Sequence, residues 1–88
     1  MLGERPVIAT HFGLECRWYP TVMDGPVFRW TYPKKAGGFQ VSASRNGVMV
    51  CGHSATYADV GELCELLRLA QGVHQQLAKG VKPAEVTF

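Results

Sequence analysis

Charged residues are scarce in this chain of 88 residues. Nine residues are Lys or Arg and seven are Asp or Glu, which makes 18% of the chain, against about 25% in an average soluble domain. The length leaves room for one domain, 1–88, and excludes a barrel enzyme, a doubly wound nucleotide-binding fold and a multidomain machine. The shortage of charge predicts a surface with more neutral and apolar area than usual.

The three cysteines are dispersed, and long apolar runs are missing. Cys16, Cys51 and Cys64 are far apart in the sequence, whereas a small secreted domain usually needs a framework of disulfides. The segment Met1–Pro6 lacks the positive and then apolar stretches of an export signal. No run approaches the roughly 20 apolar residues that span a bilayer. We therefore expect a cytoplasmic protein with no membrane partner.

No group of residues has the composition of a catalytic or metal site. Cys51, His53 and Ser54 place a thiol, an imidazole and a hydroxyl close together, but no carboxylate lies nearby in the sequence to orient the imidazole. Cys64 and His74 stand ten positions apart, which does not match the tight ligand pairs of structural zinc sites. We expect a protein that is not an enzyme and that holds no metal and no cofactor.

Basic residues are concentrated in the first part of the chain. Residues 1–54 hold six basic and three acidic residues, and residues 55–88 hold three and four. The segment Lys34–Gly38 has the composition of a phosphate-binding loop in the wrong order, because its lysines precede its glycines. A basic loop tip can still contact a phosphate backbone through charge alone. Nucleic acid is therefore a permitted partner but not a required one.

Alternating polar and apolar residues predict an antiparallel sheet over about residues 7–53. The expected strands are Val7–Phe12, Leu14–Tyr19, Val27–Tyr32 and Phe39–Ser44, with a fifth strand after Asn46-Gly47.

Asn46-Gly47 is the clearest turn signal in the chain. Both residues tolerate the positive φ angles of a type I′ hairpin turn. If these two residues form the loop, Ala43 lies opposite Val50 and Val41 lies opposite Gly52. The apolar residues of the hairpin then share one face of the sheet, and the polar residues share the other.

The last part of the sequence predicts one long helix. Residues about 57–79 have the period of an amphipathic helix, with Thr56 as a candidate N-cap and Gly80 as a natural end. Residues 81–88 form a short tail or add an edge strand. The expected fold class is α+β: an antiparallel β-meander of four to five strands with one C-terminal α-helix packed on one face.

A single helix leaves the other face of the sheet without a cover. Strand alternation places Arg17, Tyr19 and Arg29 on that open face, and Tyr19 is the aromatic residue that we expect to be exposed. Arg and Tyr contribute strongly at interfaces, so these three are candidate binding residues. The loop tips add three further candidates: Lys34, Lys35 and Arg45. The alternative is an antiparallel sheet whose second face is only solvated.

The segment from about Gly37 to Leu77 combines Gly37-Gly38-Phe39, Arg45-Asn46-Gly47 and a long amphipathic helix. This pattern resembles the hairpin-plus-helix core of very small phage-encoded accessory proteins, including some anti-CRISPR inhibitors. It is also similar to the sheet-plus-helix of phage integrase arm-type DNA-binding domains. The first resemblance implies a non-enzymatic inhibitor that blocks a larger host protein or nucleoprotein complex by occupying its surface. The second implies a small DNA-binding domain that uses the open face and the basic loop tips.

A homodimer is compatible with either function. Edge strands offer unpaired backbone groups to a second copy. Leu66, Leu69 and Val73 offer apolar helix surface beside the main apolar stripe.

Overall fold

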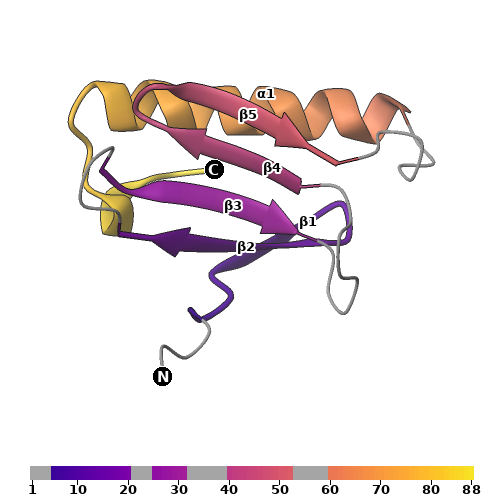
Figure 1. Cartoon of the computed structure of the whole chain (residues 1–88), viewed down its shortest axis with the longest axis horizontal. Helices are drawn as coiled ribbons and strands as arrows, with labels where there is room; N and C mark the ends of the chain where they lie inside the picture. The colour runs from indigo at the N-terminus through magenta and orange to yellow at the C-terminus, as the bar shows by residue number, and fades with distance from the viewer. Residues whose placement is uncertain (1–4, 21–24, 32–39, 53–59) are drawn as a thin grey trace.

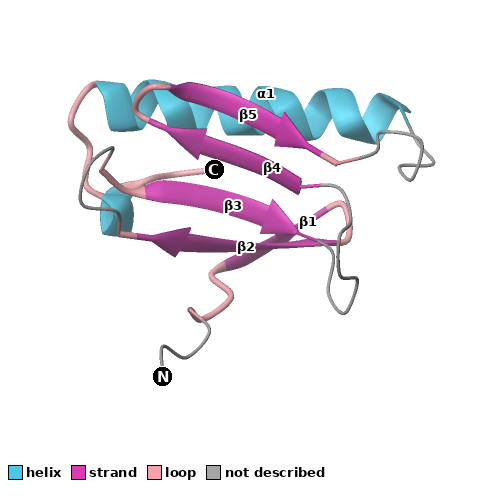
Figure 2. Cartoon of the chain, viewed as in Figure 1, coloured by secondary structure: helices cyan, strands magenta, loops and turns pink. Residues whose placement is uncertain are grey.

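The computed structural model describes residues 5–20, 25–31, 40–52 and 60–88. Five antiparallel strands follow one another in sequence order, and one helix lies against the sheet (Figures 1 and 2). The elements are β1 (Ala9–His11), β2 (Leu14–Tyr19), β3 (Val27–Thr31), β4 (Gln40–Ser44), β5 (Gly47–Cys51), α1 (Val60–Ala78) and the 3-10 helix η2 (Pro83–Glu85). The predicted α+β meander with a C-terminal helix is confirmed.

One face of the sheet forms the core, as the alternation predicts. Cys16 on β2 lies opposite Trp30 on β3, and Trp30 lies opposite Val41 on β4. The core consists of Leu14, Cys16, Phe28, Trp30, Val41, Ala43, Leu66, Ala70, Val73 and Leu77. Because successive side chains of a strand point to opposite faces, the polar residues between these positions lie on the other face.

The register predicted for the last hairpin is wrong by two residues. Ser44 pairs with Gly47, so Arg45 and Asn46 form the loop, and Val41 lies opposite Val50 rather than Gly52. The sequence Ser-Arg-Asn-Gly suits a turn that has Ser first and Gly fourth. The backbone N–H of Asn46 donates to Ser44 Oγ at 3.2 Å, and Gly47 has a φ of +147°. A shift of two residues keeps every side chain on its predicted face.

The β1–β2 hairpin contains the turn geometry that was expected at Asn46-Gly47. His11 pairs with Leu14, so Phe12 and Gly13 form a two-residue loop. Their φ angles are +53° and +81°, and positive φ at both central residues is what a type I′ turn requires. Phe12 is bulky, so the pairing of the flanking strands must offset the strain of its positive φ.

Helix α1 packs on β4 and β5. Leu66, Ala70, Val73 and Leu77 recur every three to four residues and are buried against the sheet. Leu66 and Val73 were expected as surplus apolar surface for a dimer, and that expectation is wrong because both face the core. The predicted cap Thr56 lies outside the described residues.

Helix α1 ends close to its predicted stop. The backbone N–H of Val81 donates to the Gln76 carbonyl at 3.0 Å, and that of Gly80 donates to the Leu77 carbonyl at 3.1 Å. Gly80 has a φ of +91°, which glycine adopts at low cost in such a C-cap.

The C-terminal tail covers the part of the core face beyond the helix. The tail, coloured yellow in Figure 1, runs back along β3, and η2 forms where an edge strand was the alternative. The Phe88 ring packs edge-on against Phe28 and Trp30, with centroids 6.1 and 6.4 Å apart. The side chain of Gln76 ties the tail to α1, because it donates to the Thr87 carbonyl at 2.7 Å and accepts from the Thr87 N–H at 2.9 Å.

Protonation of His11 should destabilise this arrangement. Trp30 Nε1–H donates to His11 Nδ1 at 3.1 Å, which requires a neutral imidazole at that nitrogen. Burial lowers the pKa of His11 from its ordinary 6.5. The stabilisation is therefore complete above pH 6.5 and is lost as the pH falls through the lowered pKa.

We expect the free energy of unfolding, measured by urea titration with tryptophan fluorescence, to stay level above pH 6.5 and to decline as the pH is lowered below it. His11→Gln keeps an acceptor without this titration and should flatten the decline. An equal decline in the variant would show that another group is responsible.

The three thiols should differ in reactivity. Cys16 is fully buried, and burial raises its pKa to about 12, so it stays a protonated thiol at neutral pH. Cys51 and Cys64 are exposed. We expect iodoacetamide to alkylate these two in the native protein, and Cys16 only after unfolding, as peptide mass spectrometry would show. Alkylation of native Cys16 at the rate of Cys64 would contradict the buried core.

Candidate functional site

The face of the sheet opposite α1, called the open face below, collects the polar residues of the strands. Helix α1 and the tail pack against core residues and so occupy the other face. The pairing of the strands places thirteen residues on the open face: Thr10, Glu15, Arg17, Tyr19, Val27, Arg29, Thr31, Gln40, Ser42, Ser44, Gly47, Met49 and Cys51.

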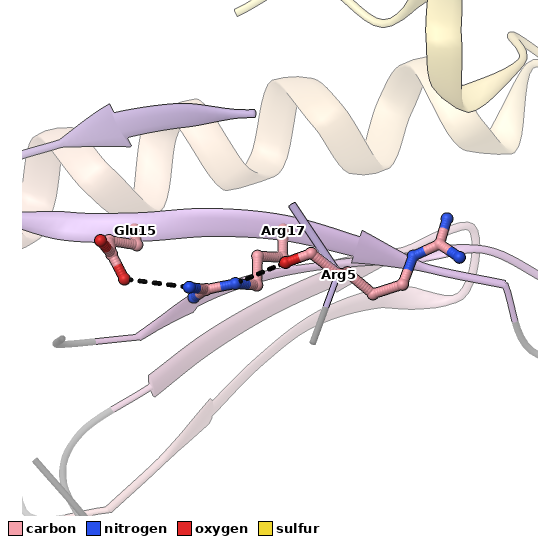
Figure 3. Close-up of polar contacts among 3 residues, drawn as sticks. All are labelled: Arg5, Glu15 and Arg17. Carbon is pink, nitrogen blue, oxygen red and sulfur yellow. Dashed lines mark hydrogen bonds and ion pairs between the residues drawn. The ribbon is translucent and has the colours of Figure 1, made fainter. Parts of the chain in front are cut away.

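Two arginines lie side by side at the centre of this face. Arg17 on β2 is directly opposite Arg29 on β3, an arrangement in which like charges repel. Arg17 Nη2 donates to Glu15 Oε1 at 3.1 Å, and Arg17 Nε donates to the Arg5 carbonyl at 2.9 Å. Figure 3 shows the Arg17 side chain between these two partners. The Glu15 carboxylate therefore offsets one of the two positive charges.

Arg29 is held differently from Arg17. Its guanidinium carbon lies 5.2 Å from the centre of the Tyr19 ring, within the range of a cation–π interaction. Its Nε is buried and has no hydrogen-bond partner among the described residues. In the same residues, Arg29 forms no ion pair. Arg29 therefore has hydrogen-bonding capacity that the described part of the chain leaves unused.

A hollow of about 390 Å³ adjoins Arg29 on the open face. It is lined by Val27, Arg29, Ser42, Ser44, Asn46, Gly47, Val48 and Met49. Arg29 is the sole charged residue in this lining, and it is joined by two serine hydroxyls and by apolar surface from Val27 and Met49. A guanidinium, two hydroxyls and an apolar wall suit a carboxylate-bearing group that has an apolar neighbour.

The predicted binding residues do not all meet at this hollow. Tyr19 was expected to be exposed, and it is half-buried because Arg29 lies over its ring. Arg45 is exposed at the β4–β5 hairpin, and its guanidinium lies against Gly25, where an added Cβ would be 3.3 Å from the Arg45 Cζ. Lys34 and Lys35 lie outside the described residues.

Of the eight lining residues, Arg29 alone was named as a candidate binding residue from the sequence. The alternation of Val27, Arg29 and Thr31 places Val27 on the open face, and this signal could have identified it. Asn46 and Gly47 line the hollow in the observed register, in which the hairpin loop ends one residue earlier than expected. Their contribution follows from the register and has no separate signature in the sequence.

The groups considered for metal binding are dispersed. Cys64 is exposed on α1, and His74 Nδ1 lies 2.7 Å from the Ser44 carbonyl; His53 lies outside the described residues. Across the described ranges, no three His, Cys, Asp or Glu side chains are close enough together to hold a metal ion. No described helix is both long and apolar enough to cross a membrane.

No protein family, curated protein or solved structure matches this chain.

Removing the Arg17 side chain should loosen the segment before β1. Arg17→Met loses the Glu15 pair and the bond to the Arg5 carbonyl, and we expect a loss of about 1 kcal/mol in the free energy of unfolding. Hydrogen exchange in residues 5–8 should accelerate.

Arg68→Met is the matched control, because the Arg68–Glu65 pair is exposed on α1 and such pairs contribute little. Equal effects of the two variants on stability and on hydrogen exchange would show that the contacts of Arg17 do not hold the segment before β1.

Proposed function

We propose that this chain is a non-enzymatic binding module whose open face docks on an acidic site of a larger protein or nucleoprotein complex. The observation that carries the proposal is Arg29, whose buried Nε lacks a partner among the described residues beside a hollow of about 390 Å³. An unpaired buried donor costs free energy until a partner supplies an acceptor. Because Arg29 forms no ion pair among the described residues, a carboxylate that docks at the hollow meets no competing acidic side chain in its lining.

The surroundings of Arg29 favour a protein side chain as the bound group. A guanidinium binds a carboxylate through two parallel hydrogen bonds, and Ser42 and Ser44 supply further hydroxyls at the hollow. Val27 and Met49 add apolar surface there, which suits the methylene groups of a Glu or Asp side chain and its neighbours. Met49 is 63% exposed, so contact with a partner would remove its surface from water.

Charge on the open face favours an acidic protein over a nucleic acid. Arg17 and Arg29 are its two cationic residues in the described strands, and Glu15 offsets Arg17. Binding to a phosphate backbone usually needs several free cations. The DNA-binding alternative and the identification as a phage-encoded inhibitor both stay predictions from the sequence.

Replacing Arg29 should weaken capture of the partner without unfolding the chain. We expect the tagged protein to retain a discrete partner from bacterial lysate after exhaustive nuclease treatment. Arg29→Gln should reduce that capture by about tenfold or more, because it removes the charge and the fork of donors. Arg29→Lys keeps the charge but loses the fork, and it should give an intermediate result.

Arg68→Gln is the control, because Arg68 lies on α1, away from the open face, and its side chain is 78% exposed. Circular dichroism should show that all variants are folded. Capture unaffected by Arg29→Gln would reject the proposed site. Loss of capture on nuclease treatment would instead favour the nucleic-acid alternative.

A further inference from the structure

Strand β5 lies at one edge of the sheet, and no described strand pairs with its outer side. Its sequence, Gly-Val-Met-Val-Cys, contains no charged residue and no proline. Met49 is 63% exposed and Val50 is 46% exposed. Proteins that stay monomeric usually protect such an edge with Lys, Pro, a bulge or a very short strand. Strand β5 has none of these protections.

The opposite edge of the sheet is protected in two ways. Strand β1 has only three residues, Ala9–His11, so it offers a short template. Beyond it, Arg5 Nε donates to the Trp18 carbonyl at 3.2 Å, and the Arg5 guanidinium lies 4.7 Å from the centre of the Trp18 ring. An arginine therefore occupies a backbone acceptor of β2 that a further strand would need. The two edges differ in their capacity to pair.

The register of the β4–β5 hairpin determines which backbone groups of β5 point outward. A two-residue loop closes on a hydrogen-bonded pair, and bonded and non-bonded pairs then alternate along an antiparallel ladder. Ser44 and Gly47 are the closing pair, so Gly47, Met49 and Cys51 direct their N–H and C=O groups to β4. Val48 and Val50 direct theirs to the outer side.

We propose that two copies of this chain pair antiparallel through β5, with the two Met49 residues facing each other across the two-fold axis. Val48 of each copy then lies opposite Val50 of the other, and the outward N–H and C=O groups of these valines bond reciprocally. Each five-stranded sheet continues into the other as a single sheet. The interface is isologous, as a symmetric dimer requires.

A second copy fits this edge because the strand is complementary to itself. In the Met49-centred register each valine meets a valine on the core face, and the methionines meet on the open face, since pairing preserves the faces. Val50 is on the core face yet is 46% exposed, so Val48 of the partner would cover apolar surface that α1 leaves in water. No charge on β5 opposes the contact. The dimer is independent of the proposed function. In the dimer, both open faces would lie on the same side of the joined sheet.

Sedimentation equilibrium over a concentration series tests the dimer. The wild-type chain should approach twice its mass of 9.7 kDa. Met49→Lys places two ammonium groups across the axis, where opposed Cα atoms of a non-bonded pair are about 4.5 Å apart. The dissociation constant of the dimer should rise by about tenfold or more. Thr10→Lys adds the same charge at an exposed position of β1 and should leave the dimer intact.

Mixing Met49→Lys with Met49→Glu distinguishes lost pairing from misfolding. At a concentration where the wild-type chain is dimeric, each variant alone should be largely dissociated, and their equal mixture should recover the dimer mass, because opposite charges then face each other. Met49→Cys, made with Cys51→Ser and Cys64→Ser, should form an interchain disulfide under mild oxidation, because the predicted Cα separation fits one. Recovery in the mixture together with this cross-link supports the register. A wild-type monomer at every concentration, a dimer unaffected by Met49→Lys, or a dimer without the cross-link would overturn the proposal.

Discussion

The packing of Trp30 connects segments that are far apart in the sequence. Its strand partners are Cys16 and Val41, its indole N–H donates to His11 on β1, and Phe88 of the tail packs against its ring. The side chain is fully buried. Removing a buried side chain of this size costs about 3–5 kcal/mol, a large part of the 5–15 kcal/mol or so that stabilises a typical domain. Trp30 therefore contacts both β1 and the tail.

Helix α1 and the C-terminal tail together cover the core face of the sheet. The open face therefore consists of strand residues. Helix α1 lies over β4 and β5, and Phe88 lies over Phe28 and Trp30. The open face then has to accommodate two adjacent arginines. Glu15 partners Arg17, and the Tyr19 ring supports Arg29. The charge that is available for a partner is therefore concentrated beside the hollow.

Strand alternation predicted the two faces correctly, but the turns that join the strands were harder to predict. Asn46-Gly47 is a strong statistical signal for a type I′ turn, yet the loop there is Arg45-Asn46, because Ser44 and Gly47 fit the ends of a different turn. Positive φ at both loop residues occurs instead at Phe12-Gly13. A bulky residue such as Phe12 is disfavoured in that conformation by about 1–2 kcal/mol, so the local sequence does not predict the turn. The pairing of β1 with β2 imposes it.

The sequence by itself determined the fold class, the strand faces and the end of the helix at Gly80. These features depend on local periods of two and 3.6 residues and on the backbone freedom of one glycine. Only the tertiary structure decided that Arg17 is partnered while Arg29 has a buried donor without a partner in the described residues. It also decided that Leu66 and Val73 are buried and that β5 is the last strand of the sheet that the structure describes. The hydrogen-bond partners and the exposure of a side chain are set by neighbours that are distant in the sequence. Two arginines can therefore have different interactions in the folded protein.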